Sequence, residues 1–321
     1  MMPTPARTDR PGMAVAAIVA VAAALSLGDA VIKGLSVTLG LWQLVLLRAM
    51  IMLAILGIIA SLGPGIGALW PARPLWAGLR GAVLVAMWMA YYAALPHLSL
   101  AAAAAGYYTL PFFILAFSAL FARERLTRRA ILAALVGFLG VLLVLRPGAA
   151  GFTSAALLPI LAAVLYALAM NLTRTRCRDD NPLSLSLTLA LAFVVAGTLA
   201  CGLGALLPDG LLPDGITGDG ALSTTWRPVG LEEIAILFFL AVILVIASVG
   251  TAFAYQNAPG GVVGACDYSY VGFAVIWGLA FHGEHPDILT LLGLALIAGA
   301  GIASLGGPRR GKAPSKPSRV L

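Results

Sequence analysis

Ten long apolar runs constrain this chain more than any other feature. Each has about 20 residues, the length that a helix needs to cross the roughly 30 Å hydrocarbon core of a bilayer. A mean hydropathy of +1.00 and a charged fraction of only 10% exclude an ordinary soluble domain. Because no run alternates polar and apolar residues, we predict helices, which satisfy their own backbone hydrogen bonds in lipid. The predicted spans are 13–33, 39–61, 75–95, 99–121, 128–146, 152–172, 183–207, 233–257, 261–282 and 287–305.

Part of this membrane-spanning sequence occurs twice. Residues 91–145 can be laid over the segment that ends at Leu305 with a constant offset of 160 residues. Five predicted spans separate the copies, and because five is odd, the second copy crosses the bilayer in the opposite sense. We therefore predict an all-α polytopic membrane protein with ten transmembrane helices in two inverted five-helix repeats, an arrangement typical of secondary transporters. The matching positions are Ala105/Ala265, Tyr108/Tyr268, Phe113/Phe273, Phe121/Phe281, Glu124/Glu284 and Leu145/Leu305.

The net charge of +7 follows the loops and does not indicate nucleic-acid binding. If the N-terminus is cytoplasmic, the inner segments hold fifteen Lys and Arg residues and the outer loops hold three. This bias predicts a multi-pass protein of the bacterial inner membrane with both termini in the cytoplasm. Residues 1–12 then form a cytoplasmic arm, and the basic tail 307–321 is expected to lie on the anionic membrane lipids of the inner leaflet. The first run looks like a signal-peptide core, but the nine spans after it favour an uncleaved helix.

No metal site, cofactor or soluble catalytic domain is predicted. The three cysteines show no metal-binding or disulfide spacing. The Asp-Gly pairs of the longest connection, 208–232, invite a calcium interpretation, yet the loop lacks the ligand spacing of a calcium-binding loop, and Asp-Gly pairs are first of all turn formers. We expect an exposed outer loop there.

Ionisable side chains inside spans are costly and point to function by default. Asp29 and Lys33 stand four residues apart in the first span, Arg48 lies roughly 13 Å into the second, and Asp267 lies in the ninth. The functional interpretation places Asp29, Arg48 and Asp267 in a polar cavity that binds substrate, with Asp29 and Asp267 as proton-coupling candidates. The structural interpretation is a buried Asp29–Arg48 pair that locks the first two spans, with Lys33 reaching the outer surface.

Aromatic and amide side chains form a second set of substrate-binding candidates. Tyr and Trp near helix ends usually lie at the membrane interface. Trp88, Tyr108 and Tyr268 are too deep for that, so we expect them to face the cavity and stack on a planar or apolar solute. The whole set is Trp88, Tyr91, Tyr107, Tyr108, Tyr166, Asn171, Tyr255, Gln256, Tyr268 and Tyr270.

The repeat makes two finer predictions about the fourth and ninth spans. Its offset places Asp267 opposite Tyr107 in pseudo-symmetry, so both are expected to look into the same cavity. Pro111 removes a backbone hydrogen bond and frees the carbonyl of Tyr107, a break that is tolerated where it faces protein or water. Val271 stands where the second copy would have a proline, so the two halves need not hinge alike.

Two further patterns indicate structure rather than chemistry. Glu124 and Glu284 each close the fourth helix of a repeat, where we expect them to pair with neighbouring basic or backbone groups. Small residues in the fifth and tenth spans recur at the spacing that lets helices approach closely in lipid. These two spans are expected to be peripheral or self-associating, which makes them the candidate contact of a homodimer. The small pairs are Ala133 with Gly137 and Ala295 with Gly299.

With these residues in view, the chain resembles the EamA-type family of the drug/metabolite transporter superfamily. The resemblance implies two tandem five-helix repeats, here 13–148 and 152–306. It also implies that helices one, three, four, six, eight and nine line the cavity. Family cargoes include amino acids and their derivatives, riboflavin-like vitamins and other small metabolites. The segments that carry it are Leu110-Pro111-Phe112 through Arg123-Glu124-Arg125, 136–141, 145–148, Ala258-Pro259 through Gly283-Glu284, Leu292-Gly293, and Asp29-Ala30 with Lys33 and Arg48.

We therefore expect a secondary transporter of a small organic metabolite that works by alternating access without ATP, with proton coupling as a hypothesis. The alternatives are a non-transporting scaffold or receptor and an intramembrane enzyme that acts on lipid. Such an enzyme needs clustered catalytic groups, whereas His97, His282 and His285 fall at loop or interface positions. The sequence names neither the substrate nor the direction of transport.

Overall fold

The structure is a computed structural model that describes residues 11–35, 39–110, 112–113, 116–117, 128–146, 153–177, 180–206, 226–257, 266 and 268–305. Several residues of the sequence analysis fall outside this part of the chain. They are Asp267, Pro111, Glu124, most of the connection 208–232, most of the arm 1–12 and the whole tail 307–321, together with the side chains of Tyr255, Gln256, Asn257 and Ala133.

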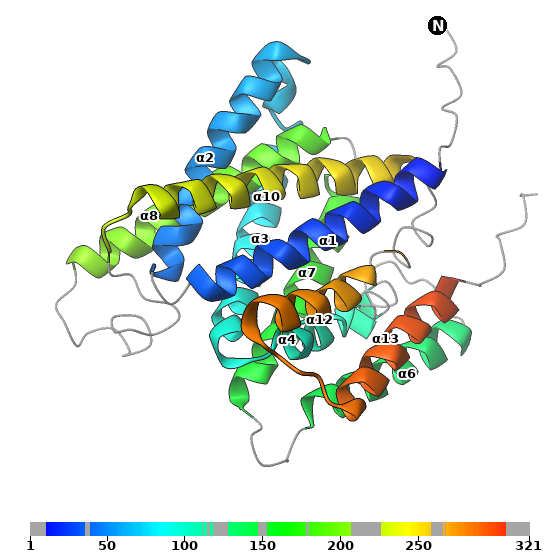
Figure 1. Cartoon of the computed structure of the whole chain (residues 1–321). Coiled ribbons are helices and arrows are strands. Elements are labelled where there is room, and N and C mark those ends of the chain that lie inside the picture. The colour runs from blue at the N-terminus through cyan, green and yellow to red at the C-terminus, as the bar shows by residue number, and fades with distance from the viewer. Residues whose placement is uncertain are drawn as a thin grey trace, which may run out of the picture.

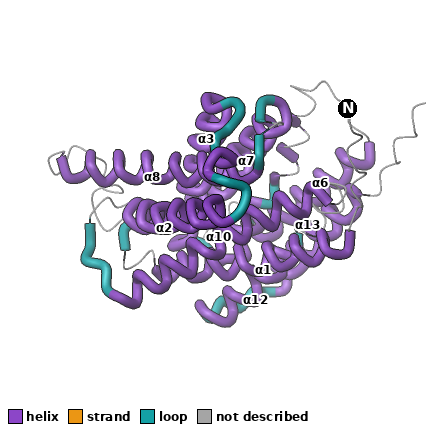
Figure 2. The backbone as a smooth tube through the Cα atoms, turned by 90° about the horizontal axis from the view of Figure 1, so that it is seen from above, coloured by secondary structure: helices purple, strands orange, loops and turns teal. Residues whose placement is uncertain are grey.

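Ten α-helices contain most of the described residues and correspond one for one to the ten predicted spans (Figure 1). No residue of the described ranges lies in a β-strand, and the described connections are loops and short 3-10 turns (Figure 2). The helices are α1 (Pro11–Leu35), α2 (Leu41–Leu62), α3 (Pro74–Ala94), α4 (Leu100–Tyr107), α6 (Arg128–Leu145), α7 (Leu157–Thr175), α8 (Pro182–Leu206), α10 (Leu231–Asn257), α12 (Ser269–His282) and α13 (Ile288–Leu305).

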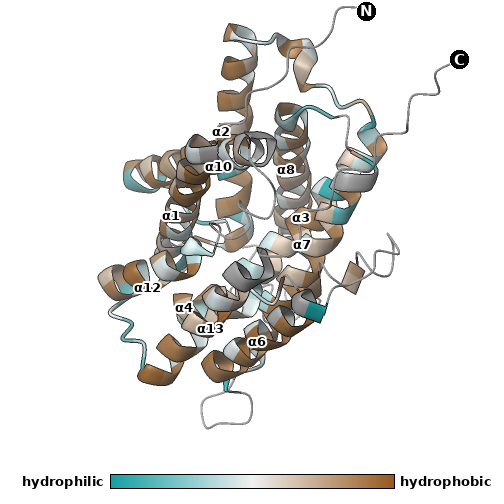
Figure 3. Cartoon of the chain, turned by 90° about the vertical axis from the view of Figure 1, so that its right-hand side faces the viewer, coloured by the Kyte–Doolittle hydropathy of each residue, from teal (hydrophilic) through white to brown (hydrophobic). Residues whose placement is uncertain are grey.

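Length and hydropathy confirm the polytopic all-α prediction. Six helical stretches, on α1, α2, α3, α7, α8 and α10, are long and apolar enough to cross a membrane. The helices α6, α12 and α13 hold shorter apolar stretches, Leu135–Leu145, Ser269–His282 and Ile288–Ala300. Hydrophobic residues cover these helices along most of their length (Figure 3). Large apolar side chains such as Leu139 and Leu199 are exposed on the outside of the bundle, as lipid-facing residues are.

The largest helix–helix contacts are related by exchange of the two halves of the chain. Exchange replaces α1, α2, α3, α4 and α6 by α7, α8, α10, α12 and α13. The contact of α3 with α7 then becomes that of α10 with α1, and the contact of α1 with α12 becomes that of α7 with α4. Likewise, α3 with α8 becomes α10 with α2, while α2–α8, α4–α12 and α6–α13 exchange with themselves. Two similar five-helix units related by a two-fold axis give this pattern.

The α6–α13 pair shows that the second unit is inverted. A Cβ at Gly137 would meet Ala300, whereas one at Gly140 would meet Ile297 and the carbonyl of Gly293. The partner number falls as the residue number rises, so the two helices are antiparallel, as the odd span count predicts. Residues 137 and 297 are equivalent in the two repeats, as are residues 140 and 300. The contact of 137 with 300 is therefore the symmetry mate of the contact of 140 with 297.

Small residues join α6 to α13 within one chain. A Cβ at Gly293 would lie 2.6 Å from the carbonyl oxygen of Gly140, so the glycines at both positions let the backbones touch. The outer faces of these helices carry exposed apolar residues such as Leu135 and Leu292, which agrees with a peripheral position. Ala295 and Gly299 are exposed on α13, and the homodimer contact through these helices stays a prediction.

Candidate functional site

Seven of the eight tyrosines gather inside the bundle rather than at the membrane interface. Tyr91, Tyr92, Tyr108 and Tyr270 are buried, and the remaining three are half-buried. Neighbouring rings lie 5.0–6.2 Å apart, mostly tilted or edge to face, the geometry that aromatic pairs prefer. We call this set the tyrosine cluster: Tyr91, Tyr92, Tyr107, Tyr108, Tyr166, Tyr268 and Tyr270, from α3, α7, α12 and the ends of α4 and α12.

The two-fold relation passes through this cluster. Tyr108 and Tyr268 occupy equivalent positions of the two repeats, and their rings lie 5.0 Å apart. Equivalent residues meet only close to the axis that relates the repeats, so the cluster lies where the two halves of the chain join. Tyr108 also packs against Tyr270, with 5.9 Å between ring centroids.

A chain of hydrogen bonds links this cluster to Asp29 on α1. The Tyr270 hydroxyl donates to Asp29 Oδ2, and the hydroxyls of Tyr91 and Tyr270 are 2.8 Å apart. A tyrosine has one O–H to donate, and Tyr270 gives it to the carboxylate, so Tyr91 is the donor of the second bond. The carboxylate is only 3% exposed. Asp29 is thus held through hydroxyls from α3 and α12, which belong to different repeats.

Arg48 on α2 lies in the same interior and is also 3% exposed. Its Nη1 donates to the Tyr92 hydroxyl at 3.0 Å, and its Cζ lies 5.4 Å from the Tyr92 ring centroid and 5.8 Å from that of Phe193. These distances allow cation–π attraction to both rings. Trp88 stacks on Tyr92 at 5.1 Å and extends this aromatic surface.

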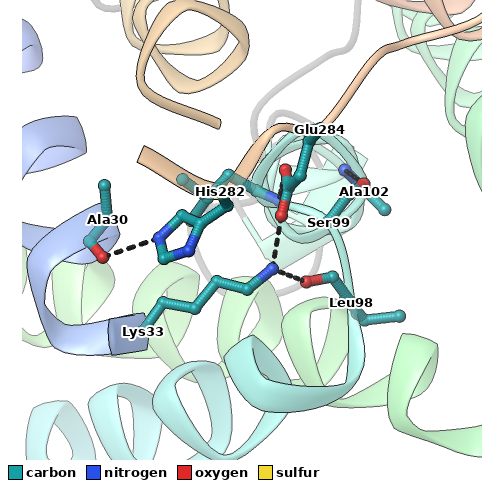
Figure 4. A network of polar contacts seen from close by, with 8 residues as sticks. Ala30, Lys33, Leu98, Ser99, Ala102, His282 and Glu284 are labelled. Atoms are coloured by element: carbon teal, nitrogen blue, oxygen red, sulfur yellow. Dashed lines mark hydrogen bonds and ion pairs between the residues drawn. The ribbon is translucent and has the colours of Figure 1, made fainter. Parts of the chain in front are cut away.

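The structural interpretation of Asp29, Arg48 and Lys33 is wrong. Asp29 and Arg48 are both described and form no ion pair with each other, because Tyr270 and Tyr92 hold them separately. Lys33 is held by protein groups rather than extended into solvent, and its side chain is 15% exposed. Its Nζ forms an ion pair with Glu284 and donates to the carbonyl oxygen of Leu98 at 2.5 Å (Figure 4).

Glu284 pairs with a basic group and a backbone N–H, as predicted, and both partners belong to the other repeat. Besides Lys33, it accepts a hydrogen bond from the backbone N–H of Leu100 at 2.8 Å. Ser99 caps the same helix, α4, by accepting from Ala102 N at 3.1 Å (Figure 4). Glu284 and Ser99 therefore satisfy two of the N–H groups that the start of a helix leaves free.

Gly283 sets the direction of the Glu284 side chain. It ends α12 with a left-handed backbone, φ 61°, which glycine adopts without steric cost. The backbone N–H groups of Gly283 and Glu284 bond back to the carbonyls of Leu279 and Gly278. The imidazole of His282, on the last turn, lies 2.9 Å from the carbonyl oxygen of Ala30 (Figure 4). The contacts of His282 with Ala30 and of Glu284 with Lys33 and Leu100 N thus fasten this end of α12 to α1 and α4.

The opposite end of the bundle is joined by a separate set of contacts. Asp180 accepts a hydrogen bond from Ala72 N at 2.5 Å, and Arg176 lies over the Trp76 ring at 4.5 Å. On α3, Arg80 Nε donates to the Thr173 hydroxyl of α7 at 2.7 Å. Contacts between the halves therefore close both ends, and the tyrosine cluster lies between them.

Most of the predicted substrate-binding residues that the structure describes converge on this interior. Asp29, Arg48, Trp88 and the tyrosine cluster belong to one connected set. Asn171 is half-buried on α7, and Asp267, Tyr255 and Gln256 carry no described side chain. The sequence analysis missed Phe193, which stands in the apolar stretch 189–197 of α8 and has no pattern to mark it.

The interior supplies charged and aromatic groups that could bind a small organic molecule. No group of three metal-ligating side chains occurs among the residues that the structure describes. The interior instead offers one carboxylate, one guanidinium and many aromatic faces in an apolar setting, which suits recognition of a small organic molecule.

Known membrane transporters are similar to this chain in sequence. Residues 12–146 match the EamA-like transporter family. The pseudopaline exporter CntI of Pseudomonas aeruginosa is 27% identical over 231 residues, which cover 70% of this chain and 72% of that protein. A riboflavin transporter of Rhizobium johnstonii is 28% identical over 243 residues, 74% of this chain and 72% of its own length.

A solved crystal structure is similar over nearly the whole chain. It superposes with a TM-score of 0.61 and covers 90% of this chain and 96% of its own, at 21% sequence identity. At that identity the likeness concerns the fold alone, and it includes the second half of the chain, which the family match does not reach.

Proposed function

The chain belongs to the drug/metabolite transporter superfamily and carries an EamA-like domain, and from this premise we propose that it moves a small organic metabolite across the bacterial inner membrane by alternating access. It is a multi-pass membrane transporter and not an enzyme. Amino acids, vitamins and related compounds are the proposed cargo class. The names of two similar proteins, a pseudopaline exporter and a riboflavin transporter, support a small metabolite as the cargo.

The carrying observation is the buried polar set at the junction of the two repeats. Asp29, Arg48, Tyr91 and Tyr270 come from both halves and lie between two closed ends. A carrier of this type needs its site where the halves meet, since the halves rock about it to open one end and then the other. We propose that Lys33–Glu284 belongs to the outer closure and Ala72–Asp180 to the inner one.

Proton coupling through Asp29 is the second part of the proposal. An ionised carboxylate is costly in a buried site, so a proton or a cationic group would be taken up there as the site changes access. The hydrogen-bond chain from Tyr91 through Tyr270 gives Asp29 partners in both charge states. Asp267 stays a second candidate, outside the described residues.

Transport is tested with purified protein in proteoliposomes and a panel of amino acids, vitamins and nucleosides. We expect counterflow of at least one compound, and flux of that compound that responds to an imposed pH gradient. Asp29→Asn keeps the shape of the side chain and should abolish the response to the gradient while exchange persists. Vesicles that neither accumulate nor exchange any compound would support a scaffold or receptor instead.

Three finer points are proposals as well. The repeats are taken as residues 13–148 and 152–306, with both termini cytoplasmic, and the exposed strip around Ala295 and Gly299 of α13 is the proposed homodimer contact. Single cysteines in the arm 1–12 should be labelled by a membrane-impermeant maleimide only in inverted vesicles. Cross-linking of Ala295→Cys between two chains, with no cross-link from Leu199→Cys on the exposed face of α8, would support the dimer.

A further inference from the structure

Arg48 carries donors that nothing in the described structure satisfies. The guanidinium has five N–H bonds, and Nη1 uses one of them on Tyr92. Both Nε and Nη2 are buried and have no hydrogen-bond partner among the described residues. A buried donor without a partner is costly, more so on a charged group, so native proteins rarely retain one without a reason.

The two free nitrogens are the pair that forms one edge of the guanidinium. By the covalent geometry of arginine, the N–H of Nε and one N–H of Nη2 point the same way and lie side by side. This edge matches the two oxygens of a carboxylate in a bidentate, charge-assisted pair. The Tyr92 hydroxyl occupies the far nitrogen, Nη1, and so fixes the plane of the group without covering the edge.

The surroundings of Arg48 favour an anion with a single charge and an organic body. Tyr92 and Phe193 lie against the guanidinium, and Trp88 continues their surface. Lys33, the other cation of this region, is already paired with Glu284. Arg48 therefore has one charge to offer in an apolar setting, where an unbalanced second negative charge would be expensive.

We propose that the transported metabolite carries a carboxylate, and that Arg48 binds it through its Nε–Nη2 edge while the rings of Trp88 and Tyr92 contact the apolar part of the same molecule. This substrate class rests on the transporter function proposed above. Asp29 does not compete for the edge, because Tyr270 holds it and it forms no ion pair with Arg48. Phosphate monoesters, which carry a second charge, are expected to bind more weakly than carboxylates.

The first test uses the wild-type protein and matched pairs of probes. Thermal unfolding of the detergent-purified protein is followed with L-phenylalanine, L-tryptophan, 4-hydroxybenzoate and nicotinate, each beside its own amide, and with phenyl phosphate. We expect stabilisation by at least one carboxylate and at least tenfold weaker binding of its amide, because ligand binding raises the apparent stability by mass action. Amides or phenyl phosphate that bind as tightly as the best carboxylate would overturn the proposal.

The second test uses Arg48→Lys, which keeps the positive charge and removes the two-donor edge. Affinity for the carboxylate probe should fall about ten- to a hundredfold, the effect of losing charged hydrogen bonds, with little change for a neutral probe. Arg80→Lys is the matched control. Arg80 lies in the first half of α3, away from Tyr92 near its end, and donates a hydrogen bond to the Thr173 hydroxyl. Equal loss in both variants, or none in Arg48→Lys, contradicts the proposal.

Counterflow separates this proposal from the transporter function itself. If proteoliposomes exchange neutral or cationic metabolites and Arg48→Lys exchanges them equally well, transport stands and the carboxylate assignment is wrong. If carboxylates bind but no compound is exchanged by any variant, the assignment of Arg48 stands and the transporter proposal is wrong.

Discussion

Removing the charge of Glu284 should loosen one end of the bundle. Glu284→Gln keeps the size of the side chain and an oxygen that can accept from Leu100 N. It removes the ion pair with Lys33, which joins α1 to the segment between α12 and α13. The ammonium of Lys33 would keep its bond to the Leu98 carbonyl.

The burial of the pair sets the size of the effect. The Lys33 and Glu284 side chains are 15% and 18% exposed. Exposed pairs contribute about 0–1 kcal/mol, whereas removal of one partner from a fully buried pair costs about 3–5 kcal/mol. Because the pair is partly exposed and Lys33 retains the Leu98 carbonyl as an acceptor, we place the cost between these limits, at about 1–2 kcal/mol. If the pair forms only when this end is closed, the open state gains about 5- to 30-fold in population.

Thiol labelling at Ala101 measures that population. Ala101, on α4, is 6% exposed, so a cysteine there should react with a maleimide only when the end opens. In a background without Cys177, Cys201 and Cys266, Glu284→Gln should speed labelling about 5- to 30-fold. Glu233→Gln is the matched control. Among the described contacts, Glu233 accepts one hydrogen bond, from the backbone N–H of Gly230 three residues earlier. Equal rates in wild type and Glu284→Gln, or the same acceleration in the control, would refute the reasoning.

Two further outcomes follow from contacts at α13. Gly293→Ala would place its Cβ 2.6 Å from the Gly140 carbonyl oxygen, so the melting temperature in detergent should fall clearly, whereas Gly299→Ala, with nothing within 4 Å, should leave it unchanged or slightly raised. Hydrogen bonds from Arg146 and Thr290 hold the pKa of Asp287 well below its ordinary value of 3.8. A depressed folded-state pKa stabilises the protein above the unfolded value, so the melting temperature gap between wild type and Asp287→Asn should persist from pH 7 to 5 and shrink below about pH 4.

The helices and their inverted arrangement could be predicted because both depend on local properties of the sequence. A run of about 20 apolar residues has no stable alternative in a bilayer to a helix. The sense of the second repeat follows from an odd number of crossings, and the antiparallel contacts of Gly140 with Gly293 and Ile297 agree with it. The depth of Tyr108 and Tyr268 also follows from their place within a span, and their rings do meet inside the bundle.

Partners of the buried charges could not be predicted, because a sequence shows which groups need partners but not which groups supply them. Asp29 and Arg48 lie in consecutive spans and have opposite charges, so the sequence favours a direct pair as the structural expectation. In the structure, Asp29 instead accepts a hydrogen bond from Tyr270, 241 positions away. Lys33 finds Glu284 at a separation of 251 residues.

By itself, then, the sequence determined the ten helices, their inverted repeat, the resemblance to EamA-type transporters and the short list of polar groups that lipid would not tolerate. These features follow from hydropathy, residue counts and motifs, which do not depend on contacts. Only the tertiary structure decided that Tyr270 and Tyr92 keep Asp29 and Arg48 apart, and that Arg48 retains a buried edge with two free donors. Contacts of this kind depend on crossing angles and rotations of packed helices, and the order of residues along one helix does not encode them.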